Sequence, residues 1–443
     1  MLRPLIVRTL LTSFGIALLG LVNSVVLSRW LGPAGRGEVA AAILWPTLLV
    51  YLSSMGLIGA ILYFAALPDS KPRAIFADGL WLGLAQGAIA VLVGFVALPW
   101  LLRSQEDAVV NAARLFLIVI PISLITQFAV SILQGRLRIA AFNWLRVILP
   151  AGYLLGTVLL IFFGGLTLSN IIFLHLFLNL IALTATLVSL WKARVPLSLR
   201  FESSLASQML KYGAKIHVGS IFGLASSSLD QALLAAFLPS RYLGLYMAAL
   251  GAASVAQVFA QAVRMVSGPS ITQRASAGER TAVLQSVFRR YWVLSLPVAM
   301  LLGAILPFAI PIVFGSEFRE AIWAAEILLI GSVLIGARDV LSGGANALGD
   351  PWLSSKAQLW AIGATVVLLS ALLPVLGIVG AAIASTVACA VQLAVVVHGL
   401  RVSHAIPSAD LFRINQADVS SSFHMLTGLI EDLGTRRMPT QAK

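Results

Sequence analysis

The sequence predicts an all-α polytopic membrane protein, and three observations support this fold class. Of the 443 residues, 59% are hydrophobic and only 11% are charged, whereas soluble domains are about 45–50% apolar and about 25% charged. The apolar residues form long continuous runs without the alternation of a transmembrane strand. The basic residues lie in the short gaps between these runs. A soluble enzyme, a disordered chain and a secreted disulfide scaffold are therefore excluded.

Twelve runs are long enough to cross a membrane, because about 20 apolar residues in a helix span a hydrocarbon core about 30 Å thick. The run 145–163 is short, and only a tight break at 373–377 separates the last two. The first run is too long for a signal peptide, so we expect it to be retained as a helix. The predicted spans are residues 10–31, 40–66, 80–102, 112–133, 145–163, 170–191, 213–237, 243–266, 291–314, 321–341, 353–373 and 377–399.

The distribution of Lys and Arg predicts the orientation of these spans. With the amino terminus inside, 24 of the 30 basic residues fall in cytoplasmic segments and 6 fall in outer segments. Cytoplasmic loops are enriched in Lys and Arg, so this asymmetry predicts that both termini are cytoplasmic and that the number of spans is even. The net charge of +13 then reflects topology and contact with anionic membrane lipids rather than nucleic-acid binding.

The two halves of the chain repeat one another. Residues 31–37 (LGPAGRG) lie between the first two spans, and residues 238–244 (LPSRYLG) lie between the seventh and eighth, at an offset of 207 residues. Further along, residues 112–114 match residues 324–326. Six spans per repeat is an even number, so we expect the repeats to share one orientation and to be related by an axis along the membrane normal.

This repeat predicts two pseudo-symmetric lobes of six helices each. Residues 1–191 form the N-lobe and residues 213–400 form the C-lobe, while the polar, basic segment 192–212 links them in the cytoplasm. A cytoplasmic tail follows at 401–443. Two similar lobes with the substrate path between them are suited to alternating access.

The sequence contains no motif of hydrolysis or metal binding. It has no phosphate-binding loop, no dinucleotide-binding glycine pattern, no HExxH pair and no nucleophile elbow. The single cysteine, Cys389, excludes a disulfide pair and a thiolate cluster. We therefore expect a transporter rather than an enzyme, without catalytic residues, cofactor or metal, driven by an ion gradient, the membrane potential or substrate supply.

Short motifs in a fixed order are spread over residues 5–400. They are the turn at 31–37, Gln134-Gly135, Gly244-Leu245-Tyr246, the segment 314–321 (FGSEFREA), Leu348-Gly349-Asp350-Pro351, and Leu373-Pro374 before Gly377. This set resembles the polysaccharide-type flippases of the multidrug/oligosaccharidyl-lipid/polysaccharide (MOP) exporter superfamily. The chain has fewer predicted spans than lipid II flippases, which favours the O-antigen or exopolysaccharide branch. The resemblance implies the MATE-like MOP fold.

The function that this resemblance implies is a flippase in the bacterial cytoplasmic (inner) membrane. It would move polyprenyl-pyrophosphate-linked oligosaccharide from the cytoplasmic to the outer leaflet by alternating access. Polysaccharide polymerases or glycosyltransferases are the implied protein partners. Two alternatives stay open, namely a cation-coupled multidrug or small-molecule antiporter of the same superfamily and a non-transporting membrane scaffold of a polysaccharide synthase complex.

Two carboxylates within the spans are candidates for coupling to H⁺ or Na⁺. Asp230 lies in the seventh span near its outer end, and Glu326 lies in the first turns of the tenth. A charged side chain at the centre of the bilayer costs about 2.5–3.5 kcal/mol on insertion scales, so each carboxylate should face the interior, be paired or be protonated. The alternative to coupling is a structural pairing, for Asp230 with the adjacent serines at 226–228.

Four cations and one amide are candidate ligands of the pyrophosphate. Arg29 and Arg114 approach from the outer side, and Lys215 and Arg264 approach from the inner side. Arginine offers permanently charged, bidentate donors to phosphate, whereas the alternative role of these cations is to reach toward lipid head groups. Asn23, on the same predicted helix as Arg29, either contacts the substrate or hydrogen-bonds a neighbouring helix.

Overall fold

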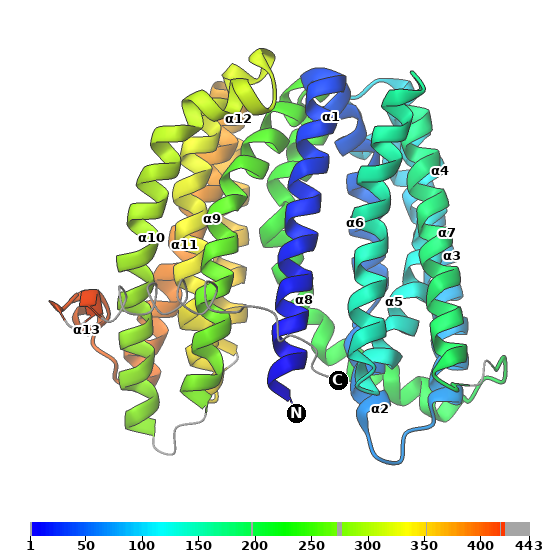
Figure 1. Ribbon diagram of the computed structural model, residues 1–443, viewed down its shortest axis with the longest axis horizontal. Helices are drawn as coiled ribbons and strands as arrows, with labels where there is room; N and C mark the ends of the chain where they lie inside the picture. The colour runs from blue at the N-terminus through cyan, green and yellow to red at the C-terminus, as the bar shows by residue number, and fades with distance from the viewer. Residues whose placement is uncertain (1, 196–197, 273–276, 351, 417, 421–443) are drawn as a thin grey trace, which may run out of the picture. The chain divides into compact units, whose positions relative to one another are not determined.

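The computed structural model describes residues 2–195, 198–272, 277–350, 352–416 and 418–420. Every regular element in these ranges is a helix (Figure 1). The elements are α1 (Leu2–Ser53), α2 (Leu57–Ala66), α3 (Pro72–Leu101), α4 (Asp107–Phe116), α5 (Val119–Gly135), α6 (Ile139–Phe162), α7 (Leu168–Lys192), α8 (Ser203–Phe237), α9 (Ser240–Thr272), α10 (Ala277–Val313), the 3₁₀ helix η1 (Ser316–Ala321), α11 (Ile322–Ala347), α12 (Trp352–His404) and α13 (Ser408–Phe412).

Among the described residues, eight helices are long and apolar enough to cross a membrane, or nine if the bent pair Ser203–His217 and Ile221–Phe237 counts as one span. The twelve predicted runs fall on helices, with short turns inside 40–66 and 112–133. Helices suit this composition because they satisfy every backbone hydrogen bond within the segment, as the bilayer requires. The prediction of an all-α polytopic protein is confirmed.

The two longest helices each contain two predicted spans. α1 has 52 residues and α12 has 53, and at 1.5 Å per residue each would be about 78 Å long if straight, more than twice the hydrocarbon thickness. Each is interrupted by a glycine in a left-handed conformation, with φ of 65° at Gly32 and 54° at Gly377. Both glycines lie where the sequence predicts the boundary between two spans.

The chain divides into two compact units. The first comprises Met1–Ala252, Pro307–Ala325 and Thr365–Ala384, and the second comprises Ala253–Leu306, Glu326–Ala364 and Ser385–Lys443. The first unit thus continues past the predicted linker 192–212, and the division into lobes 1–191 and 213–400 stays a prediction.

In the first unit, α3 fixes the start of α8. The buried carboxylate of Asp78 accepts a hydrogen bond from the backbone N–H of Glu202 at 2.7 Å, immediately before α8 begins. A carboxylate at a helix N-terminus stabilises the helix. Trp81 Nε1 donates to the carbonyl oxygen of Leu199 at 2.8 Å. The end of the predicted linker is therefore held against α3, which packs in turn on α5 (Figure 1).

The two copies of the repeated turn cross each other within the first unit. A Cβ added at Gly37 would collide with the carbonyl oxygen of Ser240, and one added at Gly244 would collide with that of Pro33. At the offset of 207 residues, Pro33 corresponds to Ser240 and Gly37 to Gly244. The contact is therefore reciprocal, as it is across a twofold axis. Glycine is required at both positions because only a residue without a side chain allows backbones to approach so closely.

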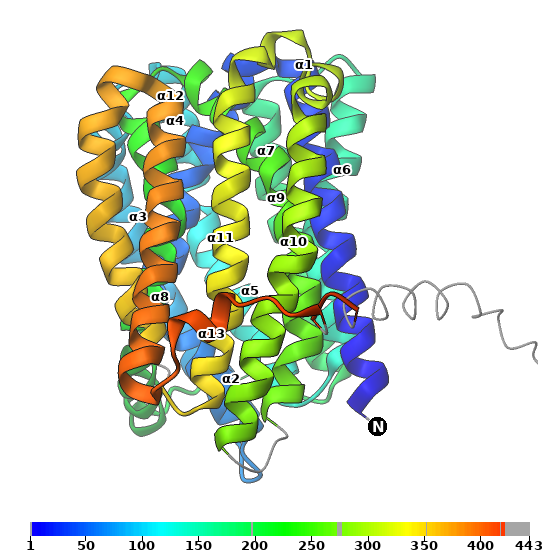
Figure 2. The same cartoon turned by 90° about the vertical axis from the view of Figure 1, so that its left-hand side faces the viewer.

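The second unit has an aromatic and aliphatic core on α10, α11 and α12. Phe288 on α10 is fully buried, and Phe412 on α13 contacts it edge to face, so that α13 lies against α10 (Figure 2). Arg289 also forms a 2.7 Å ion pair with Asp418, whose side chain is only 6% exposed. The first part of the tail is thus tied to this unit, whereas 421–443 lie outside the described residues.

Candidate substrate cavity

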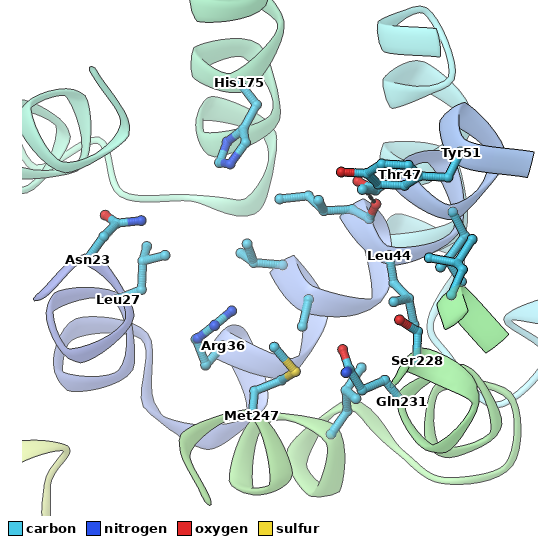
Figure 3. A pocket seen from close by; sticks show the side chains of 16 residues that line it. Asn23, Leu27, Arg36, Leu44, Thr47, Tyr51, His175, Ser228, Gln231 and Met247 are labelled. Atoms are coloured by element: carbon cyan, nitrogen blue, oxygen red, sulfur yellow. Dashed lines mark hydrogen bonds between the residues drawn. The ribbon is translucent and has the colours of Figure 1, made fainter. Parts of the chain in front are cut away.

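A cavity of about 370 Å³ lies among α1, α7, α8 and α9 of the first unit (Figure 3). Both parts of α1 contribute, because the break at Gly32 turns the chain back beside itself. Two of the helices precede the predicted linker and two follow it. We call this space the Arg36 cavity, and its walls are Asn23, Leu27, Arg36, Val39, Ala40, Ile43, Leu44, Thr47, Leu48, Tyr51, His175, Leu224, Ser228, Gln231, Leu243 and Met247.

Arg36 is the permanent positive charge of this cavity. It lies on the first turn after the break at Gly32, and its Nη2 approaches Ser24 Oγ at 3.5 Å. Its Nε is buried without a hydrogen-bond partner. In the part of the chain that the structure describes, no carboxylate lies within salt-bridge distance of Arg36. A desolvated charge without a counterion is costly, so this site is suited to binding an anion.

His175 faces Arg36 from the opposite wall (Figure 3). Its Nδ1 lies 2.9 Å from the carbonyl oxygen of Ile171, and its ring stacks on Tyr153 with the centroids 4.0 Å apart. When Nδ1–H donates to that carbonyl, Nε2 of the neutral ring is left as a hydrogen-bond acceptor. The imidazole is therefore oriented by its own helix and by a neighbouring ring.

Neutral polar side chains complete the cavity wall. Asn23, whose Oδ1 is buried without a hydrogen-bond partner, Thr47, Ser228 and Gln231 bring amide and hydroxyl groups to the same space. These groups both donate and accept hydrogen bonds, which suits the hydroxyl groups of a sugar. The cavity therefore combines one fixed cation with several uncharged hydrogen-bonding groups.

The structure places the predicted phosphate ligands at different sites. Asn23 lies in the cavity wall. Arg29 is exposed and donates from Nε to the carbonyl oxygen of Val313 at 2.8 Å and from Nη2 to that of Ile312, at the C-terminus of α10.

Two of the other predicted cations, Arg114 and Lys215, also lie apart from the cavity. The guanidinium of Arg114 lies 4.6 Å from the centroid of the Phe95 ring, and Lys215 is exposed on α8. The side chain of Arg264 lies outside the described residues.

The predicted coupling carboxylates lie in different units. Asp230 is buried on α8, where it accepts hydrogen bonds from the Tyr246 hydroxyl and from the backbone N–H of Gln231, the latter at 2.8 Å. Gln231 belongs to the cavity wall, so Asp230 lies directly behind it. Glu326 is half-buried on α11 and belongs to the second unit.

Sequence reasoning misses Arg36, His175 and Gln231 as candidate cavity residues. The predicted spans place Arg36 in an outer loop, although the helix resumes immediately after Gly32. A signal is present, because Arg36 belongs to the repeated turn and Pro33 is a residue that starts helices. His175 and Gln231 carry no comparable pattern.

These features define a polytopic helical membrane protein with an arginine-bearing cavity inside its first unit. A family profile described as polysaccharide biosynthesis protein matches residues 26–323. The chain therefore belongs to the polysaccharide biosynthesis protein family.

Two kinds of relative agree with this family and its fold. The probable low-salt glycan biosynthesis flippase Agl15 of Haloferax volcanii is 28% identical over 278 residues, which span 62% of this chain and only 58% of that protein. Lipid II flippase MurJ in an inward closed conformation has a TM-score of 0.75 at 14% identity, covering 98% of this chain and 94% of that one. An inward-facing MATE family transporter of the MOP superfamily has a TM-score of 0.67 at 15% identity, covering 88% and 95%. The predicted MOP fold is confirmed.

Proposed function

We propose that this protein is a flippase that moves a lipid-linked oligosaccharide across the membrane through the Arg36 cavity. The observation that carries the proposal is a cavity-lining arginine whose Nε is buried and which has no carboxylate partner among the described residues, inside a chain of the polysaccharide biosynthesis family with the MOP fold. The guanidinium would bind the phosphate that joins the glycan to its lipid. Asn23, Ser228 and Gln231 would bind the sugar.

The proposed mechanism is alternating access by rocking of the two predicted lobes. One form admits the phosphate and the sugar from the cytoplasmic side, and the other releases them into the outer leaflet. Each charge that crosses the membrane potential is worth about 2.3 kcal/mol per 100 mV. Because the cell interior is negative, outward movement of an anionic pyrophosphate is favourable without ATP. Coupling to H⁺ or Na⁺ through Asp230 or Glu326 would add to this driving force.

The finer features of this proposal follow the sequence prediction. They are a polyprenyl-pyrophosphate substrate, a role in O-antigen or exopolysaccharide synthesis, polymerase or glycosyltransferase partners, and a bacterial inner membrane with both termini in the cytoplasm. Arg29, Arg114, Lys215 and Arg264 stay predicted ligands along the path into and out of the cavity. A multidrug antiporter is the second candidate because MATE transporters share the fold, but Arg36 would repel the organic cations that many antiporters carry.

The test is transport by the purified protein in liposomes. A fluorescent polyprenyl-pyrophosphate oligosaccharide is incorporated, and the fraction that an impermeant quencher reaches is followed with time. We expect flipping by the wild type and a loss of at least about tenfold for Arg36→Gln, because a charged hydrogen bond is worth about 1.5–3 kcal/mol. The matched control is Arg401→Gln, which removes an exposed arginine at the end of α12 and should leave the rate unchanged.

Each alternative gives a different result in this assay. Equal rates for the wild type and Arg36→Gln would contradict the role of the cavity. Absence of flipping without an added synthase would favour the scaffold. Transport of a cationic dye in place of the lipid would favour the antiporter.

A further inference from the structure

A second cavity adjoins the Arg36 cavity and shares Tyr51 and Leu224 with it. Its volume is about 240 Å³ and it lies between the end of α1, the start of α2 and the middle of α8. Leu52, Ile58, Ile216 and Ile221 provide its aliphatic walls. We call this space the apolar cavity.

Few polar groups face the apolar cavity. The hydroxyl of Ser54 donates to the carbonyl oxygen of Tyr51 at 2.8 Å and is therefore satisfied within its own chain segment. The other polar side chains of this wall are His217 and Tyr51, and Tyr51 also belongs to the Arg36 cavity. In contrast with the Arg36 cavity, no arginine, lysine or carboxylate belongs to this wall, so the space suits a hydrocarbon chain.

The two cavities share a boundary, and the apolar cavity has an exposed rim. Tyr51 and Leu224 belong to the walls of both. Tyr51, Leu52 and Ile216 are 48%, 38% and 37% exposed, so large apolar side chains form the rim of the apolar cavity at the protein surface. At its other end the apolar cavity is closed by two backbones in contact. A Cβ added at Gly56 would collide with the carbonyl oxygen of Gly213.

We propose that the apolar cavity binds the isoprenoid units next to the phosphate, so that the two cavities together hold one amphiphile. This inference rests on the proposed function, which places the phosphate at Arg36. The phosphate of a lipid-linked glycan is joined directly to its first isoprenoid unit, so the site for that unit must adjoin the site for the phosphate, as the apolar cavity adjoins the Arg36 cavity at Tyr51 and Leu224. The rim at Tyr51 and Leu52 lets the remainder of the chain continue into the bilayer.

The predicted orientation gives this arrangement a direction. The predicted span 40–66 runs from the outer side, just after Arg36, toward the inner side, so residues 51–59 lie deeper in the membrane than Arg36. The phosphate would then lie nearer the outer surface, and its chain would extend from there toward the middle of the membrane. This is the arrangement of a substrate that started in the cytoplasmic leaflet and moves outward with its head group first.

The experiment is photochemical labelling of the full-length protein in phosphatidylcholine vesicles. The probe is farnesyl phosphate with a diazirine on the isoprenoid unit next to the phosphate, and labelled residues are mapped by mass spectrometry. We expect labelling at Ile58, Ile216 or Ile221, reduced by unlabelled farnesyl phosphate and not by phosphatidic acid. Labelling that phosphatidic acid reduces equally would overturn the proposal, because the cavity would then hold an ordinary lipid chain.

Gly59→Leu is the variant that fills the apolar cavity. A Cβ added at Gly59 would lie 3.3 Å from the flexible end of the Ile216 side chain, so the larger side chain can enter only by occupying this space. We expect labelling of the wall to fall severalfold. The matched control is Gly20→Leu on α1, where an added Cβ meets nothing within 4 Å and labelling should persist. Ile221→Phe fills the same space from α8 if Gly59→Leu fails to fold.

Arg36→Gln separates this inference from the proposed function. Loss of wall labelling in both Arg36→Gln and Gly59→Leu supports one amphiphile in two cavities. If labelling is lost in Arg36→Gln but stays complete in Gly59→Leu and Ile221→Phe, the apolar site is overturned and the phosphate site is left intact. Full labelling in Arg36→Gln contradicts the phosphate site of the proposed function, whatever the filled variants show.

Discussion

Arg36 differs from Arg29 and Arg114 in what its side chain faces. Arg29 donates to carbonyl oxygens in the last turn of α10. These oxygens lack hydrogen-bond partners within their own helix. Arg114 lies over the face of Phe95, where the ring attracts a cation. The Nε atoms of Arg36 and Arg114 are both buried without a hydrogen-bond partner among the described residues, but only Arg36 of these three arginines lines the cavity. Its charge is therefore the one that an anion bound in the cavity would meet.

The buried carboxylate of Asp230 leads to a prediction about ion coupling. Its carboxylate accepts a hydrogen bond from Tyr246 and lies behind the cavity wall. Asp230→Asn preserves the size of the side chain but removes its charge, so the dependence of flipping on pH or Na⁺ should disappear. The measurement is the flipping rate in liposomes over a series of pH values and Na⁺ concentrations.

The control for this prediction is Asp69→Asn, which changes an exposed carboxylate in the loop after α2. It should retain the dependence of the wild type. If Asp230→Asn also retains that dependence, Asp230 has a structural role, and the same series is then measured on Glu326→Gln.

Glycines at helix breaks and crossings determine how the elements of the first unit fit together. Gly32 reverses α1 so that Asn23 and Arg36 face the same cavity. Shortly beyond Gly32, the second part of α1 crosses α9 at Gly37 and Gly244, which leaves no space for a side chain. Leu243 and Met247, on either side of Gly244, line the cavity. The crossing therefore closes one end of it.

Gly37→Ala is predicted to separate α1 from α9 at this crossing. Its added methyl group would collide with the backbone of Ser240, which cannot move without shifting α9. We expect slower flipping, and stronger labelling of a cysteine at Met247 by an impermeant thiol reagent applied from the outer side. The chain suits this measurement because its single cysteine, Cys389, is buried.

Gly35→Ala is the matched control in the same turn. A Cβ at Gly35 would lie 3.0 Å from the Cβ of Leu31, a tight contact within α1 that a shift of a few tenths of an ångström relieves without moving α9. This variant should flip and label as the wild type does. Equal behaviour of Gly37→Ala and Gly35→Ala would show that the crossing does not open during transport.

At the scale of the whole molecule, the fold was predictable from sequence because the bilayer imposes simple rules. Apolar runs of sufficient length must be helices, and the gaps between runs, at 32–39 and in the tight break at 373–377, predicted where α1 and α12 are interrupted. The rotation of each helix about its axis was not predictable, since nearly all faces of these helices are apolar. That rotation decides that Arg36 and His175 share a cavity while Arg29 and Arg114 do not line it.

Transport through the Arg36 cavity requires that this cavity open in turn to each side of the membrane, and thiol labelling tests this directly. A cysteine replaces Gln231 in the cavity wall, in a Cys389→Ala background, and an impermeant thiol reagent is applied to either face of oriented vesicles. Alternating access through this cavity predicts labelling from both faces and protection from both by lipid-linked oligosaccharide. Labelling from one face alone, unchanged by that lipid, would contradict it.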